Sequence, residues 1–202
     1  MRVLIACEFS GTVRDAFIDR GHEAMSCDIL PAETPGPHYL GDVRDILGDG
    51  WDLMIAHPPC TYLSRAGARW LYPVAGQIDP ARLEKGRQAR AFFMDLYHAP
   101  IQRVAIENPT PFKVFELPAP SQVIQPYEYG HPFSKRTLLW LRGLEPLTPT
   151  DVRSDFRPLL PSNTGGAKRG QRATDGARAG ATRRRTFVGI AAAMAEQWGR
   201  AC

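Results

Sequence analysis

Short, continuous apolar runs alternate with amphipathic segments along most of the chain. Runs such as 3–6 and 52–56 are typical of strands that are buried on both faces of a parallel sheet. Apolar residues at helical spacing follow the first run, and Gly21 ends that helix. The pattern predicts further strands at 23–28, 101–106 and 137–141, and further helices at 82–97 and 187–198. This alternation indicates an α/β domain with a mainly parallel sheet and helices on both faces.

Chemically informative residues follow the predicted strands. In a parallel sheet, ligands bind beyond the carboxyl ends of the strands, near the point where the strand order switches. We therefore expect one sheet edge to gather a small-residue turn, an acid, a thiol and a carboxylate. The segments concerned are Glu8-Phe9-Ser10-Gly11, Asp28, His57-Pro58-Pro59-Cys60 and Glu107-Asn108.

Gly11 and Asp28 from this group, together with Asp42, are candidate cofactor ligands. A glycine turn such as that at Gly11 lets a ligand approach the backbone closely, and an acid at the end of a second strand commonly binds ribose hydroxyls, as Asp28 could. Asp42, in Gly41-Asp42-Val43, could add a polar contact. Each also has a structural alternative, because glycine turns occur without cofactors and either acid could serve a turn or a loop.

Cys60 and Glu107 are the candidate catalytic residues. The two prolines before Cys60 restrict the backbone and would hold the thiol in one direction. Taken singly, a lone cysteine is more often a packing residue, and a glutamate is more often a cap or an ion-pair partner. Their joint placement at one predicted edge favours chemistry.

Composition narrows the class of protein. The chain has 202 residues, of which 44% are hydrophobic and 23% charged, as in a globular domain with one core. No apolar run approaches the roughly 20 residues that span a bilayer, and the first is too short for a signal peptide. The four cysteines form no CxxC pair. We therefore expect reduced thiols, a cytoplasmic location and no membrane partner.

Positive charge is concentrated near the C-terminus. Residues 163–185 contain seven basic residues and one acid, a net charge of +6 in a chain of net charge +4. This Gly- and Ala-rich segment is predicted to be a mobile loop. It is either a solvated loop or an arm that binds nucleic-acid phosphates, and composition alone favours neither. The candidate phosphate ligands are Lys168, Arg169, Arg183, Arg184 and Arg185.

Taken together and in order, these motifs resemble those of the C5-cytosine DNA methyltransferase family. Phe9-Ser10-Gly11-Thr12-Val13-Arg14 is similar to the opening glycine-rich element, Pro58-Pro59-Cys60 to the nucleophile loop, and Glu107-Asn108-Pro109 to the E-N-V element. Gly130–Arg136 is similar to the arginine element, and Thr186–Gly199 lies where the closing helix is expected. The resemblance covers residues 3–142 and the last helix, and small phage or prophage members are the most similar.

The resemblance implies a Rossmann-like fold that binds S-adenosylmethionine. It divides the chain into a catalytic core at 1–145, a basic insert at 146–185 in place of a target-recognition domain, and a closing helix at 186–202. The implied substrate is cytosine in duplex or single-stranded DNA, without a metal. The implied catalytic residues are Cys60, Glu107 and Arg136, the cofactor residues are Phe9, Ser10, Gly11, Asp28, Asp42 and Pro58, and the DNA-binding residues include Ser64 and Lys135.

In this scheme the Cys60 thiolate adds to cytosine C6 and Glu107 assists through a protonated carboxyl, so the pKa of Glu107 should be raised. Arg136 would bind the base O2, although Lys135 could align with the same family position.

Departures from the family pattern leave more than one function open. Val13, His57 and Thr61 replace two family glycines and a glutamine. His57-Pro58-Pro59-Cys60 also resembles the D-P-P-Y loop of amino-methyltransferases that act on cytosine N4 or adenine N6. C5 methylation of RNA or a free nucleotide, and cofactor-dependent nucleic-acid binding without turnover, are also compatible with the sequence. His57, Cys60 and His131 could instead form a metal site.

Overall fold

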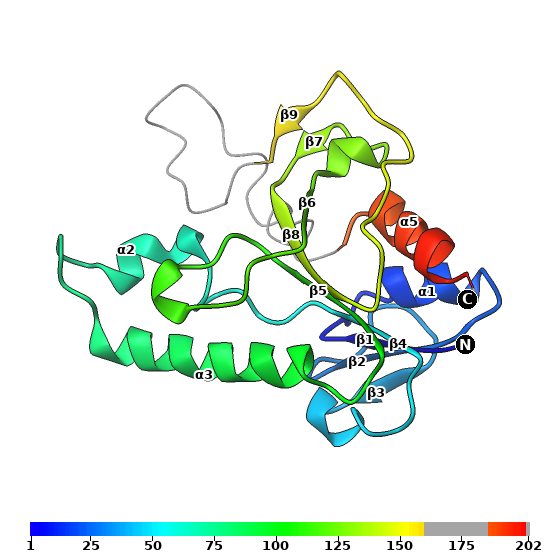
Figure 1. Ribbon diagram of the computed structural model, residues 1–202, viewed down its shortest axis with the longest axis horizontal. Helices are drawn as coiled ribbons and strands as arrows, with labels where there is room; N and C mark the ends of the chain where they lie inside the picture. Colours follow the sequence, from blue (N-terminus) through cyan, green and yellow to red (C-terminus); the bar gives the residue numbers. More distant parts are fainter. Residues whose placement is uncertain (160–185, 201–202) are drawn as a thin grey trace.

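A seven-stranded sheet forms the centre of the protein (Figure 1). The computed structural model describes residues 1–159 and 186–200. The strand order is β3-β2-β1-β4-β5-β8-β6, in which β1 to β5 run parallel, β8 is antiparallel to β5, and β6 is antiparallel to β8. Their bounds are β1 Arg2–Ala6, β2 Glu23–Asp28, β3 His38–Leu40, β4 Leu53–Ala56, β5 Arg103–Asn108, β6 Gln122–Ile124 and β8 Thr137–Arg142. The strand order switches between β1 and β4.

Helices cover both faces of this sheet. Helices α1 (Thr12–Ile18) and α5 (Val188–Trp198) lie on one face, and the long α3 (Pro80–Tyr97) lies on the other (Figure 1). Along β1, Val3 and Ile5 belong to the core cluster that contains α1 and α5, whereas Leu4 and Ala6 belong to the cluster that contains α3. Side chains of a buried strand alternate between faces in this way. The predicted α/β architecture is confirmed.

Strand β5 begins and ends two residues later than the predicted strand at 101–106. Glu107 and Asn108 still pair with Leu139 and Leu138 of β8, so both lie in the strand itself. The sequence pattern also did not predict β3, β6 or the short helix α2 (Ala68–Leu71). These elements have only three or four residues, too few to show a period.

The first part of the segment predicted as a flexible insert is folded. Leu147 is buried, and its backbone N–H and carbonyl both bond to the side chain of Gln122 at 2.8 and 2.7 Å. Strand β9 (Arg157–Pro158) pairs with β7 (Phe133–Ser134). Residues 146–159 are thus attached to the core.

The candidate phosphate ligands from Lys168 to Arg185 lie outside the described residues, which end at 159 and resume at 186. Within those ranges, no helix has both the length and the apolar character needed to cross a membrane.

Candidate active site

Three adjacent strands end together at the switch point. Ala6 of β1 pairs with Ala56 of β4, and Ala56 pairs with Ile106 of β5. His57 continues this register, because its backbone N–H donates to the Ala6 carbonyl at 2.9 Å. Residues that follow these pairs therefore lie side by side, which brings His57 next to Glu107.

The surroundings of Glu107 favour its ionised form. Its Oε2 lies 3.3 Å from His57 Nδ1, and the two side chains are 18% and 11% exposed. Burial raises the pKa of Glu107, but the positive charge of Lys135 and the hydrogen bond with His57 together shift it below its ordinary value. The predicted rise in the pKa of Glu107 is therefore wrong, because the sequence pattern did not place two basic side chains beside it.

The loop that carries Cys60 is fixed at both ends. Asn108, which is 1% exposed, donates from Nδ2 to the carbonyl of buried Pro58 at 3.0 Å. The backbone N–H groups of Leu63 and Ser64 both donate to the Cys60 carbonyl, at 3.2 and 2.9 Å. Cys60 itself is exposed. Asn108 thus connects the loop bearing the thiol to the strand bearing Glu107.

Ser64, a predicted nucleic-acid ligand, has a structural contact. Its side-chain oxygen accepts a hydrogen bond from the Ala66 N–H at 3.1 Å, and the residue is only 6% exposed. It caps the short helix η2 (Arg65–Gly67).

The two basic residues of the predicted arginine element differ in their surroundings. Lys135 is half-buried and its charge acts on Glu107, whereas Arg136 is exposed. No interaction joins Arg136 to Glu107 in the part of the chain that the structure describes. Of the two, Lys135 is the basic residue that the fold brings to the candidate site.

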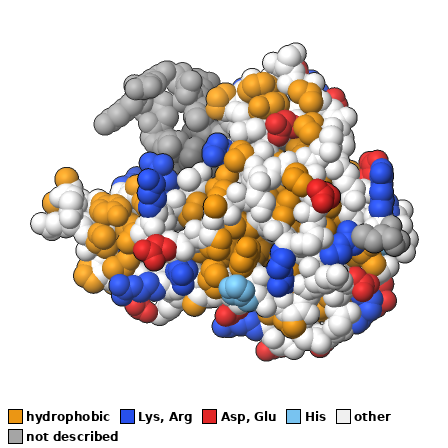
Figure 2. Space-filling model, viewed as in Figure 1, with side chains coloured by type: hydrophobic (Ala, Val, Ile, Leu, Met, Phe, Trp, Pro, Cys, Tyr) orange, Lys and Arg blue, Asp and Glu red, His pale blue; other side chains and the backbone are white. Residues whose placement is uncertain are grey.

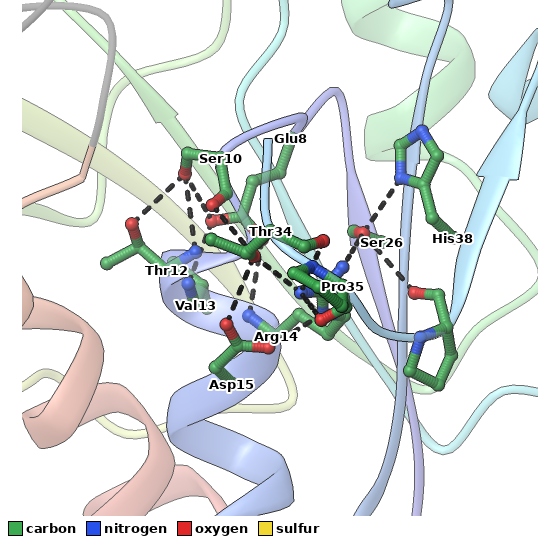
Figure 3. A network of polar contacts seen from close by, with 11 residues as sticks. Glu8, Ser10, Thr12, Val13, Arg14, Asp15, Ser26, Thr34, Pro35 and His38 are labelled. Atoms are coloured by element: carbon green, nitrogen blue, oxygen red, sulfur yellow. Dashed lines mark hydrogen bonds and ion pairs between the residues drawn. The ribbon is translucent and has the colours of Figure 1, made fainter. Parts of the chain in front are cut away.

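Glu8 occupies the N-terminus of α1. Its two carboxylate oxygens accept hydrogen bonds from the Val13 and Arg14 N–H groups at 2.8 and 3.2 Å, and Ser10 Oγ lies 3.1 Å away (Figure 3). Glu8 is 5% exposed. A carboxylate is favourable there because the helix dipole and its unpaired N–H groups attract negative charge. The sequence pattern did not predict this role of Glu8. The Glu8 carboxylate places a negative charge inside the candidate cofactor region.

The Gly11 turn is required by packing within the protein. Gly11 has φ of 76°, and a Cβ at this position would overlap Thr34 Oγ1 and lie 2.6 Å from an Arg14 guanidinium nitrogen. The fully buried Arg14 donates to Ser26 and Thr34 and so connects α1 to β2 and the loop after it (Figure 3). Packing within the protein therefore explains the glycine at position 11 without a cofactor.

A pocket opens beside these residues. It is lined by Cys7, Glu8, Phe9, Ser10, His57 and Thr186. Two predicted cofactor residues, Phe9 and Ser10, are among them, and Thr186 comes from the segment just before α5. His57 Nε2 is buried and has no hydrogen-bond partner among residues 1–159 and 186–200. The pocket is therefore lined by one carboxylate side chain and one imidazole.

The two predicted acids lie near each other at the same edge. The Gly41 N–H donates to the Asp28 carbonyl at 3.0 Å. Asp28 uses Oδ1 to accept from the Leu30 N–H at 2.9 Å. Asp42 is engaged by Arg44, whose hydrogen bonds lower the pKa of Asp42. Asp28 is therefore the more available of the two carboxylates for a ligand.

Cys7 and Cys27 differ from Cys60 in exposure. Burial raises the pKa of the Cys7 thiol far above its ordinary value and raises that of Cys27 to about 12. Thiols of this kind stay protonated and are poor nucleophiles. Cys60, which is exposed, is the cysteine whose position suits chemistry.

The candidate metal ligands are not gathered at one point. Within the described ranges, no group of three or more His, Cys, Asp or Glu side chains is arranged to hold a metal ion. His131 accepts a hydrogen bond at Nε2 from the Gly189 N–H at 3.0 Å, so it contacts the start of α5.

Comparisons with known proteins give solved structures only. No protein-family model matches the chain, and no curated protein does. The chain is similar to the methyltransferase EhMeth of Entamoeba histolytica, with 14% identity, a TM-score of 0.46, and coverage of 76% of this chain and 57% of that one. It is also similar to a mutant of DNMT2 from Spodoptera frugiperda, with 17% identity, a TM-score of 0.36, and coverage of 79% and 55%.

The chain thus spans slightly more than half the length of these two structures. The fold assignment rests on the sheet itself. Its parallel strands, its switch between β1 and β4 and its helices on both faces form the Rossmann-like α/β fold that the sequence predicted.

Proposed function

We propose that this protein is an S-adenosylmethionine-dependent methyltransferase that modifies C5 of cytosine through a covalent adduct with Cys60. The observation that carries the proposal is the 3.0 Å hydrogen bond from Asn108 to the Pro58 carbonyl. This contact holds the thiol-bearing loop against the strand that carries Glu107. A nucleophile and a carboxylate, each on a rigid support, are what addition to a pyrimidine ring requires.

The chemistry explains the need for a thiol. C5 of cytosine is a poor nucleophile, but addition of the Cys60 sulfur to C6 converts the ring into an enamine whose C5 can attack a methyl group. Bound S-adenosylmethionine supplies that methyl group as a sulfonium. Transfer of the C5 proton to water and cleavage of the bond from sulfur to C6 would then restore the aromatic ring and the thiolate. A base in a duplex must first leave the stack to reach Cys60.

Glu107 would bind the edge of the base that carries N3 and the exocyclic amine. His57 orients the Glu107 carboxylate through their 3.3 Å contact, and Lys135 supplies positive charge beside it. The ionised carboxylate is an acceptor for the amine of cytosine. In this proposal the cation near the base is Lys135, in the role predicted for Arg136 from the family resemblance.

The residues of the pocket fit the proposed cofactor. Glu8 brings a buried negative charge to a pocket for a ligand that carries positive sulfonium and ammonium groups. The unpaired Nε2 of His57 can bond a polar ligand atom, and Asp28 has a carboxylate oxygen suited to ribose hydroxyls. Phe9 and Ser10 contribute lining. The basic residues between 163 and 185 remain proposed phosphate ligands for DNA.

Methyl transfer from labelled S-adenosylmethionine to duplex DNA, single-stranded DNA, RNA and dCMP tests the proposal. Cys60→Ser should abolish transfer and leave cofactor binding by calorimetry unchanged, because the thiol reacts with the base. Cys27→Ser is the matched control, since the Cys27 thiol is fully buried and far too weakly acidic to react.

Each outcome of this experiment has a distinct meaning. Full activity of Cys60→Ser would indicate an amino-methyltransferase instead. Cofactor binding without transfer to any of the four acceptors would indicate a binding protein without turnover. The absence of cofactor binding would overturn the whole proposal.

A further inference from the structure

An exposed surface immediately after Cys60 combines aromatic side chains with arginines. We call it the α2 surface and define it as Tyr62, Arg65, Arg69, Trp70 and Tyr72. Trp70 is 54% exposed and Tyr72 is 37% exposed. Figure 2 shows hydrophobic side chains gathered over α2, with Lys or Arg side chains beside them. Exposed aromatic side chains that form a contiguous patch commonly mark a binding surface.

The α2 surface is supported by the rest of the protein. Leu63 and Leu71 are buried in the same core cluster as α3, at 0% and 1% exposure. Arg82 of α3 donates to the Thr61 carbonyl at 2.8 Å, and the Asp79 N–H donates to the Leu71 carbonyl at 2.9 Å. Because its neighbours in sequence are anchored, Trp70 is presented to solvent by the fold.

Positive groups lie over the rings. The Arg69 guanidinium is 4.6 Å from the Trp70 ring centroid, and Arg82 is 4.9 Å from that of Tyr62. Residues 61–78 include two arginines and no acid. The next residue, Asp79, is an acid whose Oδ1 accepts from the Arg82 N–H at 2.6 Å, at the start of α3. Flat rings and positive charge complement a ligand that combines planar groups with negative charge.

We propose that the α2 surface binds single-stranded nucleic acid, with bases stacked on Trp70 and Tyr72 and phosphates near Arg65 and Arg69. A stacking platform needs bases whose faces are open, and the bases of a duplex are already stacked on one another. The platform begins next to Cys60, so it would hold nucleotides that flank the reacting base. This last point rests on the proposed function, whereas binding by the surface does not.

Binding of a fluorescently labelled single-stranded oligonucleotide to the full chain, followed by anisotropy, tests the proposal. All proteins carry Cys60→Ser so that no turnover occurs. Trp70→Ala should weaken binding by about 5- to 140-fold, the range expected for the loss of one stacked base. Trp70→Phe should retain most of the affinity, and Trp70→Leu should lose it as Trp70→Ala does, because leucine keeps the apolar area but has no π face.

Phe156→Ala is the matched control. Phe156 is 43% exposed and stacks on Tyr127 beside β9, away from the α2 surface. Its removal should leave the affinity unchanged.

Intrinsic fluorescence gives a second readout. The other three tryptophans, Trp51, Trp140 and Trp198, are at most 7% exposed, so quenching by a stacked base should come from Trp70. The quenching should vanish in Trp70→Phe.

Three results would overturn the inference: undiminished binding by Trp70→Ala, wild-type binding by Trp70→Leu, or equal affinity for duplex and single strand. The second would instead indicate an apolar docking surface for a protein. Binding that depends on Trp70 without methyl transfer by the Cys60 protein would support this inference and count against the proposed function alone.

Discussion

Replacing Asn108 by alanine tests the contact on which the proposed site depends. The change removes the donor to the Pro58 carbonyl, in a position that is 1% exposed. Leaving a buried acceptor without its partner costs about 1–3 kcal/mol of unfolding free energy. For a chain of this size, each kcal/mol lowers the melting temperature by about 2–4 °C, so we expect a loss of about 2–12 °C.

The catalytic effect should exceed the effect on stability. A displacement of reacting groups by about 1 Å can lower a rate by about 100-fold. Release of the Pro58 carbonyl frees the loop that holds Cys60, so the single-turnover rate of methyl transfer should fall by about that factor at a temperature where the protein is folded. Cofactor affinity should change little, because neither Asn108 nor Pro58 lines the pocket.

Gln122→Ala is the matched control for this experiment. Its side-chain amide also makes hydrogen bonds, part-buried ones, to the backbone of Leu147, but on the far edge strand β6. Gln122→Ala should lose about as much stability as Asn108→Ala but keep the wild-type single-turnover rate of methyl transfer. The reasoning would be refuted if the two variants lost equal activity, or if Asn108→Ala were as stable as the wild type.

Two further changes probe the protonation of the site and the packing beneath it. Because the pKa of folded Glu107 is depressed, its ionised form contributes stability above the ordinary pKa of 4.5, and this stability is lost as the pH falls through the folded value. The free energy of urea unfolding of the wild type should therefore fall relative to that of Glu107→Gln as the pH drops below about 4.5. A difference between the two proteins that does not change with pH would contradict the assigned direction. Gly86→Ala in α3 should destabilise by about 1–3 kcal/mol in the same assay, because its Cβ would overlap the buried ring of Phe115, whereas exposed Gln88→Ala should have little effect.

The architecture was predictable because the central strands are buried on both faces. Such strands must be apolar throughout, so the runs at 3–6 and 53–56 stood out against their surroundings, and β2 was predicted with its observed bounds. The ends of the strands were less predictable. Glu107 and Asn108 are polar, yet they continue β5 because β8 pairs with them, and that pairing is a tertiary contact.

Residues 146–159 show the same limit. The family resemblance assigned them to a flexible insert, but Leu147 is fixed by Gln122, a residue 25 positions away. A local pattern contains no information about such a partner.

Some features of the candidate site could be predicted from the sequence, and others could not. The gathering of Glu8, His57 and Glu107 at one edge follows from strand order, so it could be expected from the sequence. The contact between His57 and Glu107 follows from the pairing of β4 with β5 and could also have been inferred. The resemblance brought Lys135 or Arg136 to the base, but it did not predict that the charge of Lys135 acts on Glu107, since that depends on how the connection between β7 and β8 folds back. The error in the pKa of Glu107 has this origin.

An ionised Glu107 also constrains the proposed chemistry. N3 of neutral cytosine is a hydrogen-bond acceptor, and so is a carboxylate, so the two can bond only if one proton is taken up between them. Addition of the Cys60 sulfur to C6 pushes electron density toward N3, which makes the proton more strongly held as the adduct forms. Glu107 would then stabilise the adduct more than the initial complex, which is the requirement for lowering a barrier. In the proposed reaction, the positive charge of Lys135 and the hydrogen bond with His57 would favour the ionised carboxylate before the base binds, so the proton would be taken up from water as the base is engaged.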